Sequence, residues 1–345
     1  MQMEPMLVAG ILVVILALAF AFSTGFNDAA NVVAVVISTK VLSPRKAVLA
    51  VGVLEFIGAY FLGTAVAETM GTGVVDPNLI SGDKYGIIII LATLLGATLW
   101  NVICTILGFP VSASHALVGG FAGAGVVAAG FGAVQWINVF GIFLVLVASP
   151  VLGLVTSFVL TKFTNFVAKG AKPAANKLVI GLEIFATIGS ALATGANAAQ
   201  RPMGIIVFSL IVLGLYQPAT EAFVPTWVVV TCGMGVSIGV LCAGKNVVKT
   251  VGMRYYRLRH INGFSVQAAS AGVIQLANII GSPVSTTQVT SGAVMGTGTA
   301  ERIRGVRWSV GTRVFLVWLI TMPSTAVACG LLYWLILNIV KFFNL

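Results

Sequence analysis

The sequence predicts an all-α polytopic membrane protein made of two inverted-topology repeats, with broken helices and two opposed re-entrant hairpins. The first observation behind this prediction is composition: of 345 residues, 59% are hydrophobic and 8% are charged, against roughly 25% charged residues in soluble proteins. The second is a series of apolar segments near the length of about 20 residues that a helix needs to cross a bilayer. The third is a pair of motifs that each occur twice. The composition excludes a cytosolic enzyme, a disordered chain and a secreted disulfide scaffold.

Apolar segments follow one another along the whole chain. A basic stretch, 162–177, divides them into a first repeat, 1–161, and a second repeat, 178–345. The segments expected to form helices are 6–39, 47–67, 85–107, 110–131 and 136–160 in the first repeat and 178–217, 222–243, 264–281, 284–299 and 308–340 in the second.

The net charge of +10 is unevenly distributed, because all but three of the 19 Lys and Arg residues lie in four segments between the apolar ones. These segments are 40–46, 162–177, 245–259 and 302–313. Basic segments on alternate connections are typical of cytoplasmic loops of a membrane protein, so the charge indicates membrane topology and not nucleic-acid binding. The loops that carry Asp76 and Glu221 then face outward, and both termini are expected outside the cell membrane.

Two motifs occur once in each half, in the same order. Residues 24–31 (TGFNDAAN) align with 194–201 (TGANAAQR) at an offset of 170, and 108–115 (GFPVSASH) align with 281–288 (GSPVSTTQ) at an offset of 173. Two pairs at nearly one offset indicate a duplication. Because the charge pattern of the second half mirrors that of the first, the two copies are predicted to insert in opposite orientations.

The first motif places polar residues in the middle of an apolar segment. A continuous helix over 6–39 would be about 50 Å long at 1.5 Å per residue, well beyond a bilayer core of about 30 Å, so we expect a break near residues 25–27. Asp28 is a carboxylate at membrane depth, where charge is costly and usually functional. With Asn27 and Asn31 it offers oxygen ligands for a small cation, and sodium is assigned to Asp28 and Asn27. Capping of a half-helix by Asp28 is the alternative, and the two roles are compatible.

The second motif ends one helix at a proline and starts another with hydroxyl residues. Helix N-termini carry free N–H groups and a partial positive charge, which favour an anion. If 85–131 and 264–299 are hairpins from opposite sides, their tips meet near the membrane midplane and form an anion site. Ordinary proline-kinked helices with capping hydroxyls are the alternative. The hydroxyl residues assigned to the anion site are Ser112, Ser114, Ser285, Thr286 and Thr287.

Charged residues inside apolar segments complete the candidate set. Arg201 is the one basic residue within an apolar span, close behind Asn197 and Gln200, and these three are assigned to the substrate site. An arginine that extends to the membrane interface is the alternative for Arg201. Glu55 and Glu183 also lie inside apolar segments and are candidate cation or proton ligands.

These residues resemble the inorganic phosphate transporter (PiT) family of cation–phosphate symporters. The family's duplicated Gly-Ala-Asn-Asp signature is similar to residues 25–28 and, in the second half, to 195–201. Its Pro-Val-Ser-Thr-Thr-His hairpin element is similar to 110–115 and 283–288, and 305–308 also has the family's pattern, so the resemblance covers nearly the whole chain. It implies phosphate uptake coupled to sodium or protons, with Asn, Asp and hairpin hydroxyl positions lining the sites.

Three positions depart from the family pattern. Ala198 stands where the second signature has Asp, Gln288 stands where His is usual, and Ala113 replaces a hairpin Thr. The loss of one carboxylate removes a cation ligand or a proton acceptor. Hydrogen phosphate carries a proton that needs an acceptor and sulfate does not, and sites built around a hydrogen bond discriminate strongly. A sulfate permease of the same family is therefore an alternative, although Asp28 remains as an acceptor and favours phosphate.

The sequence as a whole predicts a secondary symporter working by alternating access and not an enzyme, because it contains no catalytic triad or metal-ligand constellation. The expected partners are inorganic phosphate, membrane lipid and sodium, which is favoured over the proton as coupling ion. No other cofactor is expected, and the resemblance leaves a homodimer open. Moving one charge against 100 mV costs about 2.3 kcal/mol, so import of an anion into a negative interior needs cations. An anion channel is the less favoured alternative, since a passive pore has no use for Asp28.

Overall fold

The computed structural model describes residues 3–72, 86–170, 172, 175–217, 223–242 and 248–343, and this part of the chain is helical without strands. Within these ranges, five helices are long and apolar enough to cross a membrane. They are α1 (Met3–Thr39), α5 (Gly86–Leu107), α7 (Trp136–Val167), α8 (Asn176–Val212) and α13 (Trp308–Phe342). The prediction of an all-α protein with many apolar helices is confirmed.

Shorter helices connect and pack against these five. The expected segment 47–67 forms two helices, because the chain turns at Gly63, which has a φ of +88°. The helix α7 continues through 162–167, so the connection to α8 is shorter than the predicted linker. The predicted outward loops that carry Asp76 and Glu221 lie outside the described residues. The shorter helices are α2 (Pro44–Phe61), α3 (Ala65–Thr72), α6 (Ala113–Ala129), α9 (Thr226–Leu241), α11 (His260–Ile279) and α12 (Thr286–Glu301), with single turns at η1 (Phe131–Ala133), η3 (Thr250–Arg254) and η4 (Ile303–Gly305).

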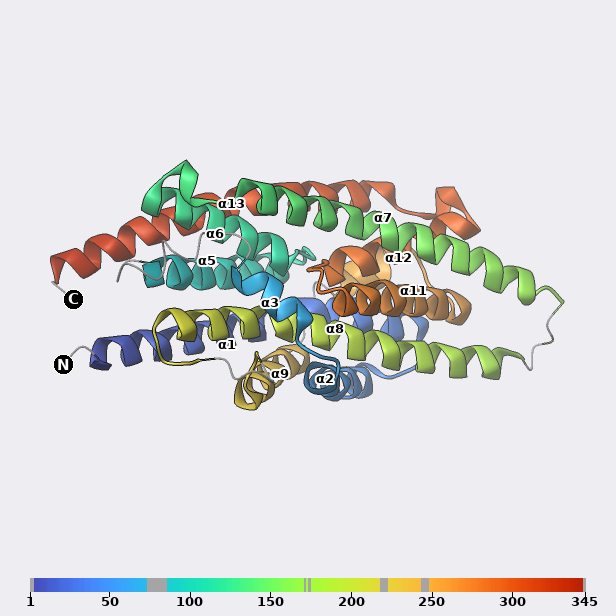
Figure 1. Ribbon diagram of the computed structural model, residues 1–345. Coiled ribbons are helices and arrows are strands. Elements are labelled where there is room, and N and C mark those ends of the chain that lie inside the picture. Colours follow the sequence, from blue (N-terminus) through green and yellow to red (C-terminus); the bar gives the residue numbers. More distant parts are fainter. Residues whose placement is uncertain are drawn as a thin grey trace.

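The two halves exchange their packing partners through glycines. At Gly25 of α1, an added Cβ would lie 2.0 Å from the backbone oxygen of Val236 in α9, so only glycine permits this approach. At the corresponding Gly195 of α8, the distance to the backbone oxygen of Glu55 in α2 is 2.2 Å. Each half therefore packs its first long helix against the second helix of the other half. Figure 1 shows α1 and α8 side by side and running in opposite directions.

The hairpin helices repeat this exchange on the other side of the molecule. At Gly123 of α6, an added Cβ would lie 1.9 Å from the backbone oxygen of Ala326 in α13. At Gly292 of α12, it would lie 2.1 Å from the backbone oxygen of Pro150 in α7. Close backbone contact between small residues is the usual way for helices to associate in lipid, where the hydrophobic effect does not drive them together.

The turns of the two hairpins have the same backbone conformation. Gly108 and Gly281 end α5 and α11 with φ values of +82° and +68°. The N–H of Phe109 donates to the oxygen of Cys104, and that of Ser282 donates to Ala277, both at 2.9 Å, as in a glycine-terminated helix. The turns face each other near the middle of the molecule (Figure 1). Equivalent turns 173 residues apart follow from the duplicated Gly-x-Pro-Val-Ser pattern.

The predicted break near residues 25–27 is wrong, because α1 is continuous from Met3 to Thr39. The helix α8 is likewise continuous over 37 residues. The glycine at position 25 serves the close approach to α9 and not a turn. The polar side chains that follow Gly25 form hydrogen bonds with other helices, so they are satisfied without an interruption of α1. The interruptions in the helical chain lie in the hairpin turns instead.

The outside of the bundle is apolar, and its interior combines an apolar core with a set of buried polar and charged side chains. Ile137 is 88% exposed and Phe185 is 75% exposed, whereas Asp28, Glu55 and Arg201 are at most 1% exposed. A soluble protein shows the opposite distribution of charged groups. This arrangement suits a bilayer, in which every polar group must be satisfied inside the protein.

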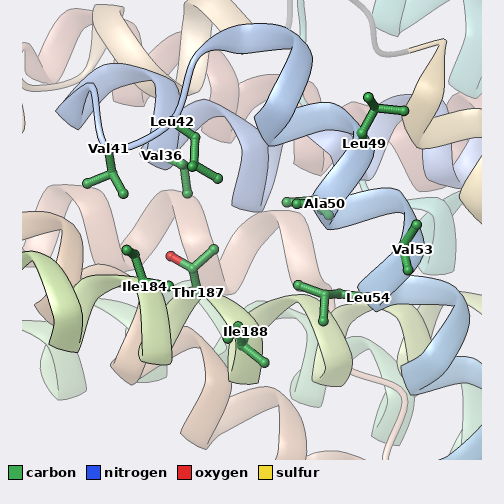
Figure 2. Close-up of a pocket in the computed structure, with 11 residues that line it drawn as sticks. Val36, Val41, Leu42, Leu49, Ala50, Val53, Leu54, Ile184, Thr187 and Ile188 are labelled. Carbon is green, nitrogen blue, oxygen red and sulfur yellow. The ribbon is translucent and has the colours of Figure 1, made fainter.

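An apolar groove of about 520 Å³ lies between α1, α2 and α8 (Figure 2). Side chains such as Val36, Leu54 and Ile188 line it, and Thr187 is the one polar side chain among its lining residues. An anion that entered this groove would lose its hydration without finding hydrogen-bond donors. The groove is therefore not a candidate substrate site.

The close contact at Gly195 predicts the effect of a single methyl group. The substitution Gly195→Ala is expected to lower the free energy of unfolding by about 1–3 kcal/mol, the usual cost of overpacking, because the new Cβ would meet the Glu55 backbone. Gly181→Ala in the same helix is the matched control, since no atom lies within 4 Å of its added Cβ. Thermal unfolding of the detergent-solubilised variants measures the difference, and equal midpoints would contradict the packing described above.

Candidate functional site

A buried carboxylate joins α1 to the second hairpin. The hydroxyl groups of Thr286 and Thr287, in the first turn of α12, donate to Asp28 Oδ2 and Oδ1 at 3.0 and 2.8 Å. Asn31 Nδ2 donates to Asp28 Oδ1 at 3.1 Å, one turn along the same helix. The structure brings Asn31 to Asp28, and it also places Thr286 and Thr287, which the sequence analysis assigned to the anion site, on the same carboxylate.

The neighbouring amide joins α1 to the first hairpin. Asn27 Nδ2 donates to the backbone oxygen of Val111 at 2.7 Å, and Asn27 Oδ1 accepts from the Thr105 hydroxyl at 3.3 Å. Successive residues on a helix point about 100° apart, so Asn27 and Asp28 face different hairpins. The structure therefore does not bring the side chain of Asn27 into the set of groups that contact Asp28.

The second copy of the motif makes a related set of contacts from α8. Asn197, which corresponds to Asn27, donates from Nδ2 to Asn278 Oδ1 at 2.7 Å. Arg201 Nη2 donates to Asn197 Oδ1 at 2.6 Å and to the backbone oxygen of Val284 at 3.3 Å. Val284 corresponds to Val111, so both Asn residues are connected to a hairpin turn, one directly and one through Arg201. We use the term polar centre for Asn27, Asp28, Asn31, Asn197, Arg201, Thr286 and Thr287.

Two opposite charges are buried in the polar centre. Asp28 and Arg201 interact electrostatically, but they do not form a direct ion pair among the described residues. Arg201 is 1% exposed, so the alternative of an arginine that extends to the membrane interface is wrong. The first half therefore contributes a buried carboxylate and the second half a buried guanidinium. Both charges lie inside the protein, where bulk water does not solvate them.

The remaining candidate residues lie around the hairpin turns. Ser112 and Ser285 cap α6 and α12 by accepting from the backbone N–H of His115 and Gln288 at 3.3 and 3.4 Å. Their side chains therefore serve first to start the two helices. Gln200 Oε1 accepts from the backbone N–H of Val66 at 2.7 Å, which connects α8 to α3.

Several buried polar atoms have no hydrogen-bond partner within the described part of the chain. Buried polar groups are usually paired, and an unpaired one costs about 1–3 kcal/mol, so these atoms need an explanation. They include the donor atoms Arg201 Nε and Gln200 Nε2, the acceptor atoms Asn31 Oδ1 and Gln288 Oε1, and the hydroxyl group of Ser114. Unpaired donors suit an anion, and unpaired acceptors suit a cation.

Glu55 and Glu183 have different surroundings. Glu55 is fully buried on α2, neither carboxylate oxygen has a partner in the described chain, and it interacts electrostatically with Asp28. Glu183 accepts from Thr39 Oγ1 at 2.5 Å and lies 3.1 Å from His260 Nδ1. Thr39 is about 16 Å along α1 from Asp28, at 1.5 Å per residue. The structure therefore places Glu55 near the polar centre and Glu183 at a separate position.

Sequence reasoning missed two residues that hold the amides of the polar centre. Thr105 binds Asn27, and Asn278 binds Asn197 and donates to the backbone oxygen of Ala193 at 3.0 Å. Both precede a hairpin turn by the same number of residues, because 105 and 278 differ by 173. The offset that aligned the hairpin motifs would have identified them.

Known proteins are similar to this chain over nearly its whole length. A model of the phosphate transporter family matches residues 24–329. A probable low-affinity inorganic phosphate transporter of Bacillus subtilis is 37% identical, with 98% of this chain and 100% of that protein covered. One with the same description from Rhizobium meliloti is 36% identical, with 92% and 93% covered. The solved structure of a sodium-dependent phosphate transporter has a TM-score of 0.84 and 27% identity, with 96% and 100% covered.

The buried amide pair predicts a measurable contribution to stability. Asn278→Ala is expected to lower the free energy of unfolding by about 1–3 kcal/mol, because it leaves Asn197 Nδ2 buried without its partner. Asn138→Ala removes an exposed amide contact to Gln135 at 2.6 Å and should change the unfolding midpoint little. Thermal unfolding of the two variants tests this, and a larger loss for the exposed site would refute the assignment.

Proposed function

The chain belongs to the phosphate transporter family, and from that premise we propose that it imports inorganic phosphate by symport with a cation, sodium in preference to the proton. The observation that carries the proposal is the polar centre itself. It combines a carboxylate, a guanidinium, amides and hydroxyl groups deep inside an apolar bundle. A substrate with several negative charges and a small cation both find suitable groups there.

The anion is bound between the hairpin turns in this proposal. Arg201 Nε and Gln200 Nε2 are buried donors without a partner in the described chain, and Ser114 adds a hydroxyl group. The first turns of α6 and α12 contribute the partial positive charge of helix N-termini. Because Thr286 and Thr287 donate to Asp28, they transmit the state of the carboxylate directly to the anion side.

The cation is bound on the carboxylate side. Asp28 and the neighbouring Asn31 supply oxygen ligands of the kind that hard cations prefer. Glu55, buried with both oxygens unpaired in the described chain, supplies a second negative charge or a proton site. Two carboxylates near each other repel, so a bound cation between them gains from both. Glu183 is not included in this set, because Thr39 and His260 occupy its oxygens.

Transport follows from alternating access between two inverted repeats in this proposal. The reciprocal glycine contacts of α1 with α9 and of α8 with α2 support a duplicated architecture in which helices of one half pack against helices of the other. The hairpins 85–131 and 264–299 enter from opposite sides, and their turns meet at the substrate. The basic loops lie in the cytoplasm, both termini lie outside, and the protein resides in the plasma membrane.

Sulfate is the second candidate substrate, and the observation that favours it is Ala198. This residue is fully buried beside Asn197 and Arg201, so the second copy of the motif has no carboxylate to accept a proton from hydrogen phosphate. Asp28 supplies one acceptor from the first half. A site with one acceptor still distinguishes hydrogen phosphate from sulfate by one hydrogen bond, which can produce strong discrimination.

Uptake by proteoliposomes tests the proposal. Radiolabelled phosphate uptake should rise with an inward sodium gradient, and Asp28→Asn should reduce that rise about tenfold or more, since a charge-assisted contact is worth about 1.5–3 kcal/mol. Glu68→Gln, an exposed acid on α3, is the control that should retain uptake. Uptake driven only by a pH gradient would assign proton coupling, and uptake indifferent to any cation gradient would indicate an anion channel.

Competition with sulfate tests the substrate. Excess sulfate is expected to leave sodium-driven phosphate uptake nearly unchanged, because it cannot donate a proton to Asp28. Uptake of labelled sulfate under the same gradient provides the direct comparison. Sulfate transported as rapidly as phosphate would contradict the phosphate assignment.

A further inference from the structure

A basic cavity of about 540 Å³ lies away from the polar centre, between the end of α1, the start of α8 and residues 257–261. It is found where the basic segments 40–46, 162–177 and 245–259 come together. Four cationic side chains line it: Lys40, Lys172, Arg257 and Arg259. The rest of its lining includes small polar and apolar residues and His260, and no carboxylate is among the residues that line it in the described chain.

Two helices begin at this cavity. Asn176 and His260 are the first residues of α8 and α11, and both line it. The residue before α8 is Ala175, whose side chain cannot cap the helix. The free N–H groups and partial positive charge at a helix start favour an anion. At the start of α11, the N–H of Arg259 is bonded to Asn262 Oδ1 at 3.0 Å, so the uncapped start of α8 and the basic side chains are the groups that act on this space.

Lys40, one of the cationic residues that line the cavity, has an unusual backbone conformation. Its φ of +66° is the one positive φ of a non-glycine residue in the described chain. Glycine is the usual residue in this conformation at the end of a helix, and a lysine there is strained. Backbone strain is commonly retained at functional positions. The strained residue carries one of the cavity's positive charges.

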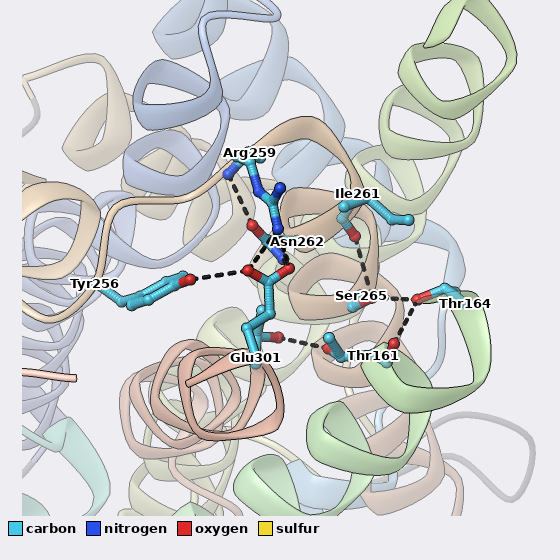
Figure 3. A network of polar contacts seen from close by, with 9 residues as sticks. Thr161, Thr164, Tyr256, Arg259, Ile261, Asn262, Ser265 and Glu301 are labelled. Atoms are coloured by element: carbon cyan, nitrogen blue, oxygen red, sulfur yellow. Dashed lines mark hydrogen bonds and ion pairs between the residues drawn. The ribbon is translucent and has the colours of Figure 1, made fainter. Parts of the chain in front are cut away.

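Two carboxylates, Glu301 and Glu183, contact residues that line the cavity, and each is already paired with them. Glu301 forms an ion pair with Arg259 at 2.5 Å and accepts from Tyr256 and Asn262 (Figure 3). Partial burial acts to raise the pKa of Glu301, but these hydrogen bonds and the Arg259 guanidinium have the larger effect and lower the pKa below its usual value. The carboxylate is therefore ionised and neutralises Arg259. Glu183 is held by Thr39 and His260. Lys40, Lys172 and Arg257 form no ion pair with the described residues, so their charges remain for a ligand.

We propose that this basic cavity is a second anion site, which binds a phosphate group apart from the polar centre. The ligand is either free inorganic phosphate or the phosphate of a lipid headgroup, since both present the same tetrahedral anion. The inference rests on the proposed function in one respect: free phosphate is taken as a ligand because the protein is proposed to release phosphate on the side of the membrane where this cavity lies. The cavity's charges and the start of α8 belong to this chain whatever is transported.

Equilibrium dialysis of purified protein in phosphatidylcholine nanodiscs against radiolabelled inorganic phosphate tests the site. We expect two classes of binding, one that depends on sodium and belongs to the polar centre, and one that does not. The double substitution Lys40→Gly with Arg257→Gln should weaken the sodium-independent class about tenfold or more and leave the sodium-dependent class. Arg304→Gln with Arg313→Gln removes the same charge from basic residues that do not line the cavity, and should retain both classes.

The design separates the cavity from the fold and from the transport site. Glycine suits the backbone at position 40, so Lys40→Gly alone should raise the thermal unfolding midpoint while it weakens binding. Loss of the sodium-independent class when phosphatidic acid is added would assign the site to a lipid headgroup, and its persistence would assign it to free phosphate. A single, sodium-dependent class in the wild type would overturn the cavity proposal alone. A single, sodium-independent class would contradict the proposed coupling instead.

Discussion

One turn of α1 holds both hairpin turns, and the arrangement of the whole centre depends on it. Asn27 bonds to the backbone of the first turn and Asp28 to the hydroxyl groups of the second. Because adjacent residues on a helix point in different directions, two consecutive side chains can hold two segments that are more than 170 residues apart. Any movement of one hairpin relative to α1 must break or exchange these contacts, which places the polar centre at the point where the halves are coupled.

The glycine contacts determine which parts can move together. A helix that packs at glycine against the backbone of another has almost no freedom to slide, because a shift of one residue brings a side chain into the contact. The pairs α1 with α9 and α8 with α2 are joined in this way, as are α6 with α13 and α12 with α7. Each pair combines one helix from each half. The close glycine contacts therefore join the two halves to each other pair by pair.

The two copies of the first motif differ at two positions that carry charge. Asp28 and Asn31 in the first half correspond to Ala198 and Arg201 in the second. The first half therefore supplies the negative charge and the second half supplies the positive one. A symmetric pair of carboxylates would repel an anion from both sides. In the symport proposed above, this arrangement gives the anion one attractive side and leaves the other to the cation, so the divergence of two residues divides one repeated motif into two kinds of surface.

The sequence predicts that a helix starts at the hydroxyl residues of each turn, because Ser112 and Ser285 are local caps, and the structure has both caps. The sequence also places the end of each preceding helix at the proline, whereas that end lies at Gly108 and Gly281. It did not allow us to predict that α1 is continuous. A helix longer than the bilayer core can be broken or unbroken, depending on whether other helices satisfy its polar side chains. The same limit explains Glu183. Burial of a carboxylate requires a partner, and the chain alone does not specify whether that partner is a bound cation or, as here, the hydroxyl of Thr39 and the ring of His260. Glu55 has the same sequence signature but no partner in the described chain, so the two glutamates are distinguished by distant contacts and not by their own neighbourhoods in the sequence.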